Sequence, residues 1–199
     1  GSGTTTGTHN TIVGAHSGNT INTGQYNTIL GAETAISLAG GSYNSVIGRR
    51  AGYGLTSGTY AAALGTFALY SNQTGAGNTA LGSHAGYSYT GGGGVFVGSE
   101  AGYGMVSGDT VMIGYQAGKR MASGTGNVGV GYGVLYGGSG TAADNTGTSN
   151  TAIGNNVLRW ISKTIGTTAL GANAGYYSTG SYNTFMGFGA GHGSVTSAP

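Results

Sequence analysis

Several ingredients of common protein classes are scarce or missing in this chain of 199 residues. It has no cysteine, a single proline, and charged residues make up only 5% of it. Without cysteine there is neither a disulfide framework nor a thiolate metal site. The net charge of +2 is spread thinly and forms no basic stripe of the kind that binds nucleic acid. No apolar run reaches the length of a membrane span, so we expect no membrane insertion.

Glycine, by contrast, is abundant, with 46 residues. Such a content is typical of disordered chains, but disorder normally goes with high net charge and few apolar residues. Here one phrase recurs about eleven times: Asn-Thr, two apolar residues and a closing glycine, which we call the anchor glycine. The anchor glycines are at positions 14, 31, 48, 65, 82, 98, 114, 131, 154, 171 and 187. A period of about 17 residues is typical of a solenoid.

Two adjacent apolar columns precede the anchor glycine. The residue directly before it is apolar in every copy, and the residue before that is apolar in nearly every copy, as in Ile29-Leu30 and Val46-Ile47. Neighbouring residues of a strand point to opposite faces, so both faces of this strand should be covered. One face is expected to line the interior of the coil and the other to pack against an identical chain, which predicts a homo-oligomer and, most simply, a homotrimer.

Two further columns follow the anchor glycine. The third residue after it is small in every copy, and the fourth is usually glycine, as in Ala85-Gly86 and Ala101-Gly102. Small residues suit a narrow interior, and glycine allows a corner with positive φ. The sequence therefore predicts an all-β protein, a parallel β-roll or β-solenoid of about eleven 17-residue coils, with two short strands in each coil. The asparagine column is expected to form a hydrogen-bonded ladder along one corner.

The pattern also divides the chain. Residues 1–8 form a lead-in, 9–193 a single solenoid domain and 194–199 a tail. The step from Gly131 to Gly154 is 23 residues, which places about six extra residues in a loop at about 137–149. In solenoids such insertions often lie on the binding face.

The phrase Asn-Thr-x-x-Gly-x-x-Ala-Gly-Tyr, as in Asn78 to Tyr87, resembles the repeats of bacteriophage tail-fibre proteins. It is also similar to the β-roll repeats of trimeric autotransporter adhesin heads. The resemblance extends from about His9 to His192. It implies a trimeric fibre segment of a virion that attaches to a bacterial surface polysaccharide or outer-membrane receptor. A bacterial extracellular adhesin head, located at the cell surface, is the alternative.

An aromatic stripe is the first candidate site. It occupies the fifth position after the anchor glycine, at Tyr53, Tyr70, Tyr87, Tyr103 and Tyr176. One hypothesis is stacking against sugar rings. The other is a structural tyrosine ladder that covers a corner or fills a subunit interface.

The second candidate site surrounds the insertion. Asp144 and Asn145 of the loop are expected to lie near a group of aromatic and cationic residues, namely Tyr136, Arg159, Trp160 and Lys163. An aromatic side chain flanked by cations suits an anionic glycan. The alternative is that Trp160, the single tryptophan, packs under the loop and holds it.

Catalysis is not expected. The acids are Glu33, Glu100, Asp109 and Asp144, and the two glutamates share a column but lie four coils apart. That separation is roughly 19 Å at one strand spacing per coil, well beyond the approximately 5–10 Å of a glycosidase pair. His16 and His84 are equally far apart. We therefore predict no enzyme, no cofactor and no metal site.

An ice-binding solenoid is a third functional hypothesis, because the residue three before the anchor glycine is often threonine. That column is Thr11, Thr28, Ser45, Ala62, Thr79, Val95, Val111, Val128, Thr151, Thr168 and Thr184. The hydroxyls are lost across the middle coils, which argues against a flat ice-binding row.

Overall fold

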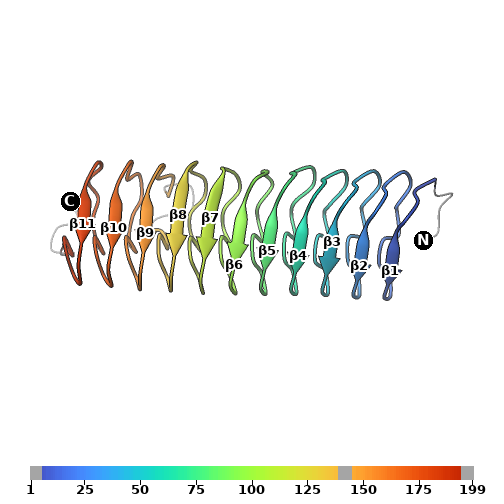
Figure 1. Cartoon of the computed structure of the whole chain (residues 1–199), viewed down its shortest axis with the longest axis horizontal. Helices are drawn as coiled ribbons and strands as arrows, with labels where there is room; N and C mark the ends of the chain where they lie inside the picture. Colours follow the sequence, from blue (N-terminus) through green and yellow to red (C-terminus); the bar gives the residue numbers. More distant parts are fainter. Residues whose placement is uncertain (1–5, 139–144, 194–199) are drawn as a thin grey trace.

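The computed structural model describes residues 6–138 and 145–193, which form one elongated β-solenoid (Figure 1). Each coil contributes one short strand, and the eleven strands form one parallel sheet in sequence order. The strands are β1 Thr11–Val13, β2 Thr28–Leu30, β3 Ser45–Ile47, β4 Ala62–Leu64, β5 Thr79–Leu81, β6 Val95–Val97, β7 Thr110–Ile113, β8 Asn127–Val130, β9 Thr151–Ile153, β10 Thr168–Leu170 and β11 Thr184–Met186. Ten steps of about 4.8 Å give a rod of about 48 Å.

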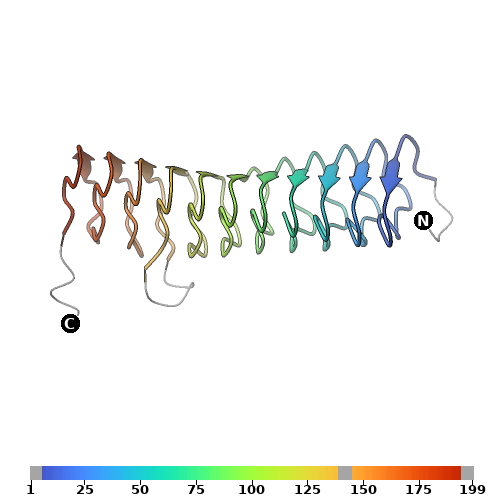
Figure 2. The same ribbon diagram turned by 90° about the horizontal axis from the view of Figure 1, so that it is seen from below.

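The prediction of a parallel β-solenoid is confirmed, but the prediction of two strands in each coil is wrong. Seen from below, all strands lie along one side, and the opposite side is built from turns (Figure 2). The turn side carries many residues with positive φ, both glycines such as Gly52 and non-glycines such as Arg50 and Leu69. Such left-handed residues interrupt extended backbone, so a second strand does not form.

The interior is built from the middle residue of each strand. Ile29, Val46, Phe96 and Met112 are fully buried there. The small residues in the third position after the anchor glycine pack against them from the turn side. Ala51 and Ala85 of this column are also fully buried, as predicted. The core side chains of neighbouring coils complement one another in volume. Gly129 leaves space for the long side chain of Met112 in the preceding coil, because a Cβ on Gly129 would lie 2.9 Å from the sulfur of Met112. The solenoid therefore has its own continuous core within a single chain.

The anchor glycine is required by two constraints. At Gly48 the φ angle is 129°, a conformation that residues with a side chain rarely adopt. A Cβ at that position would also lie 2.6 Å from the carbonyl oxygen of Gly65, the anchor of the next coil. Backbone therefore stacks directly on backbone at this corner, which explains the strict recurrence of glycine.

The predicted asparagine ladder is present. Asn44 Nδ2 donates to Asn27 Oδ1 at 3.0 Å and to the carbonyl of Gly58 at 2.9 Å. The ladder also crosses the 23-residue step, where Asn150 Nδ2 donates to Asn127 Oδ1 at 3.1 Å. The strands on either side, β8 and β9, pair in parallel with Val128 opposite Thr151. The insertion therefore leaves the stacking of the coils intact.

Candidate functional site: the outer sheet face and its corners

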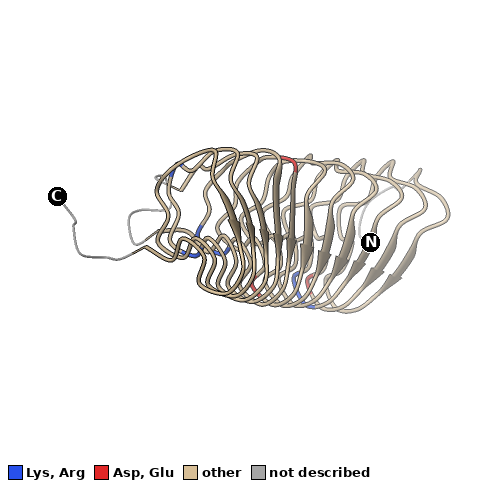
Figure 3. Cartoon of the chain, turned by 60° about the vertical axis from the view of Figure 1, so that its left-hand side comes forward, with Lys and Arg blue, Asp and Glu red and all other residues tan. Residues whose placement is uncertain are grey.

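The outer face of the sheet is a regular surface that extends over all eleven strands. Because the middle residue of each strand points inward, the residues before and after it point outward. The outward column next to the anchor glycine is aliphatic in all eleven strands: Val13, Leu30, Ile47, Leu64, Leu81, Val97, Ile113, Val130, Ile153, Leu170 and Met186. The other outward column is the threonine-rich one. None of these positions is charged, and all strands are free of charged residues in Figure 3.

Seven of these eleven side chains are exposed in the single chain, and the other four, Ile47, Val97, Ile113 and Val130, are partly buried. Leu30 is 44% and Leu64 49% exposed, and Met186 at the last strand reaches 69%. The second apolar column of the sequence is therefore only partly covered by its own chain.

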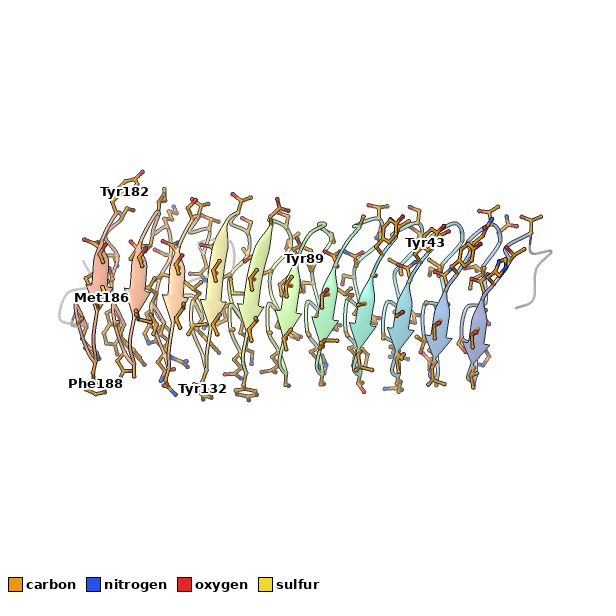
Figure 4. The ribbon with its side chains drawn as sticks, in the orientation of Figure 1. Tyr43, Tyr89, Tyr132, Tyr182, Met186 and Phe188 are labelled. Carbon is orange, nitrogen blue, oxygen red and sulfur yellow. The ribbon has the colours of Figure 1, made fainter. Side chains whose placement is uncertain are left out.

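Aromatic residues border this face beyond both ends of the strands, as Tyr43 and Tyr182 do on one side and Tyr132 and Phe188 on the other (Figure 4). Before the strands, His9, Tyr26, Tyr43 and Tyr60 form a stacked ladder with ring centroids 4.6 to 5.2 Å apart. After the strands, Tyr115 and Tyr132 stack at 5.6 Å. Sequence reasoning missed both groups, although each occupies one column: five before and one after the anchor glycine.

The predicted aromatic stripe forms a ladder over four coils. Tyr53, Tyr70, Tyr87 and Tyr103 stack with centroids 4.9 to 5.0 Å apart. Both faces of Tyr70 and Tyr87 are thereby used by neighbouring tyrosines, as is one face each of Tyr53 and Tyr103. This geometry favours the structural interpretation over stacking against sugar rings. Tyr176 stands apart and stacks on His192 at 5.1 Å.

Axial ion pairs accompany this ladder. Arg50 Nε lies 2.7 Å from Glu33 Oε2, and Lys119 Nζ lies 2.8 Å from Glu100 Oε2. The hydrogen bond from Arg50 lowers the pKa of the Glu33 carboxyl, and that from Lys119 lowers the pKa of Glu100. Both carboxylates are thus held ionised by a partner one coil away.

Around the insertion, the structure brings three of the predicted residues together. The guanidinium carbon of Arg159 lies 4.4 Å from the ring centre of Tyr136 and 5.8 Å from that of Trp160. Arg159 Nη1 donates to Asn156 Oδ1 at 2.8 Å. Among the described residues, Arg159 has no carboxylate partner, and the buried Trp160 Nε1 has no acceptor.

The other predicted members of this site do not join it. Asn145 is fully buried, its Oδ1 accepts from the Gly138 amide at 2.8 Å, and its Nδ2 donates to the carbonyl of Arg120 at 3.0 Å. It thus closes the base of the insertion rather than facing a ligand. Lys163 is exposed, with no ion pair within the described chain. Asp144 lies outside the described residues.

The remaining candidates for catalytic and metal-binding residues do not come together in the described structure. Glu33 follows β2 and Glu100 follows β6, and each is engaged in its own ion pair. No three His, Cys, Asp or Glu side chains gather as metal ligands in the parts of the chain that the structure describes. Within the same residues there is no helix with the length and apolarity needed to cross a membrane.

Comparison with protein-family models, with curated proteins and with solved structures gave no match.

Proposed function

We propose that this chain is a structural and adhesive segment of a trimeric attachment fibre, of the kind found in bacteriophage tails, whose copies pack through their outer sheet faces. The single observation that supports this is the charge-free outer face, with an aliphatic residue at every one of eleven strands. Contiguous exposed apolar surface of this regularity is typical of an interaction site.

The area of the outer strand face can be compared with the area that a stable protein interface buries. A length of about 48 Å and a width of about 10 Å, from three residues per strand, give about 500 Å². A stable interface needs about 800 Å² on each partner. The strand face alone falls short, so the bordering aromatic residues, including Tyr43 and Tyr132, are expected to contribute as well.

An identical chain is the partner that fits this face best. It carries the same strand spacing over the same eleven coils, so every layer of the stack meets an equivalent layer. It also brings no charge into the contact, since its own outward columns are equally uncharged. Three copies around a common axis shield all three faces at once and give a stiff rod that presents its corners three times, which increases avidity for a repetitive cell surface.

The solution mass tests the assembly. Light scattering is expected to give about 58 kDa, three times the 19.4 kDa of one chain. Leu64→Glu places a charge in the face and is expected to yield monomers. Gln73→Glu adds the same charge at an exposed position outside the strands and is the matched control. A mass of 19.4 kDa for the unaltered chain would contradict the proposal.

The adhesive contact is proposed to involve Tyr136, Arg159 and Trp160, with an anionic glycan as ligand. This rests on the guanidinium that stacks on Tyr136 and has no carboxylate partner in the described structure. Titration with polygalacturonate is the test. Arg159→Gln is expected to weaken binding about fivefold or more, whereas Arg49→Gln, an exposed arginine at another corner, is not. Equal affinities for both variants would refute this site.

Two alternatives remain. A bacterial adhesin head would use the same assembly with a different anchor. An ice-binding solenoid is favoured by one observation: the threonine column lies on the outer face of the sheet. A monomeric chain with thermal hysteresis would support ice binding, and a trimer without it would oppose it.

A further inference from the structure

A regular sheet face creates an alignment problem for the proposed assembly. The outward column next to the anchor glycine is aliphatic in every strand. Two copies that slide past each other by one coil, about 4.8 Å, therefore still place aliphatic on aliphatic. This aliphatic column can hold two copies together, but it does not specify how they align along the axis. Strands with a uniform side-chain pattern generally specify their register weakly.

The second outward column has the pattern that the first one lacks. It reads Thr11, Thr28, Ser45, Ala62, Thr79, Val95, Val111, Val128, Thr151, Thr168 and Thr184. Three consecutive valines, in β6, β7 and β8, thus lie between hydroxyl-bearing residues on both sides. The strand pairing keeps these residues in line, with Thr79 opposite Val95, Val95 opposite Val111 and Val128 opposite Thr151.

The valine block distinguishes the aligned state from shifted ones. In the proposed assembly, with this column nearest the common axis, copies in register place each hydroxyl against a hydroxyl and each valine against a valine. A shift of one coil leaves ten overlapping strands and opposes a hydroxyl to an apolar group in four: Ser45 with Ala62, Ala62 with Thr79, Thr79 with Val95, and Val128 with Thr151. Each such layer buries a hydroxyl against methyl groups, which is unfavourable without a compensating hydrogen bond.

We propose that this hydroxyl and valine pattern sets the axial register in which copies of the chain assemble. The inference rests on the proposed homo-oligomer and assigns the residues that align it. The pattern acts as buried polar residues do in coiled coils, where a few positions in an apolar seam fix the alignment. Tyr115 and Tyr132, which stack just beyond the ends of β7 and β8, follow the aliphatic column of the same strands.

The test moves the block by one coil without changing the composition of the chain. The double variant Thr79→Val with Val128→Thr carries valines in β5, β6 and β7. On its own it remains matched in register and is expected to assemble like the unaltered chain. Refolded together with the unaltered chain, it meets two mismatched layers, so mixed oligomers are expected to fall at least about tenfold below random mixing in native mass spectrometry.

The matched control exchanges the same residue types off the face. Thr74→Val with Val106→Thr alters two exposed positions outside the strands, and this variant is expected to mix randomly with the unaltered chain. Random mixing of the block-shifted variant would overturn the register proposal while leaving the oligomer intact. Monomers in every sample would instead overturn the assembly on which the proposal depends.

Discussion

Asn44 donates its side-chain amide to Oδ1 of Asn27 at 3.0 Å, one coil below it in the stack. The same Asn27 oxygen accepts the backbone amide of Asn44, and Asn44 Oδ1 accepts the amide of Ala61 in the next coil. Asn44 is almost completely buried. One side chain thus satisfies groups of three successive coils inside the molecule.

Asn44→Ala is expected to destabilise the chain by about 2–4 kcal/mol, because it removes two donor contacts and leaves the buried amide of Ala61 without an acceptor. Urea unfolding at matched chain concentration measures this. Asn155→Ala, at an exposed position after β9, is the control and should change the stability by less than about 0.5 kcal/mol. Similar losses for both variants would show that the ladder contributes little.

Gly102→Ala tests the tight packing around Phe96. Gly102 has φ +62°, and an added Cβ would overlap the Phe96 ring. Backbone strain and overpacking together are expected to cost about 2–4 kcal/mol. Gly77→Ala has a similar φ of +68° but nothing within 4 Å, so it should cost only about 1 kcal/mol of backbone strain. If both variants unfold at the same urea concentration, the Phe96 contact is looser than described.

Glu100 is expected to make stability fall in acid. Hydrogen bonds from Lys119 and Gln116 keep the pKa of Glu100 below its usual value. Its contribution is therefore present above the unfolded-state pKa of about 4.3 and is lost as pH falls through the lower folded-state pKa. The pair is partly solvated, so the effect should stay below about 1 kcal/mol.

Glu100→Gln should flatten this part of the pH profile in urea unfolding measured between about pH 5 and pH 2. Asp109→Asn removes a carboxylate that has no ion pair in the described structure, and it serves as the control. An unchanged profile for Glu100→Gln would mean that the pair does not bias folding.

Tyr89 is expected to make the stability of the fold decrease at alkaline pH. Burial raises the pKa of Tyr89 to about 12, and its hydroxyl lies 2.8 Å from the carbonyl oxygen of Gly92 and 2.9 Å from that of Gly108. Its contribution is fully present below the unfolded-state pKa of about 10 and is lost as pH rises through the folded-state value. Tyr89→Phe should lower stability at neutral pH by about 1 kcal/mol.

The same variant should also lose part of the alkaline decline, which urea unfolding between about pH 9 and pH 12 would show. Tyr60→Phe, at an exposed position of the corner ladder, is the control. Equal alkaline profiles for Tyr89→Phe and the unaltered chain would contradict a buried, protonated Tyr89.

Much of the fold follows from the sequence alone, because each coil repeats the same local solution. The anchor glycine, the apolar pair and the asparagine recur at one spacing, and stacked identical coils must place these residues in columns. That reasoning predicted the parallel solenoid, the inward and outward apolar columns and the asparagine ladder. It also grouped Tyr136, Arg159 and Trp160, since residues one period apart become neighbours.

Other features depend on the tertiary structure and cannot be deduced from the aligned columns of the repeat. Backbone angles at residues such as Arg50 and Leu69 make the far side of the coil a run of turns, so only one strand forms. The buried state of Asn145 depends on how the chain closes after an insertion, which breaks the period. Ring orientation likewise follows from stacking in three dimensions, and this is why the inner ring faces of the tyrosine ladder are already occupied. The sequence determined which residues become neighbours, and the packing decided which of their surfaces remain accessible.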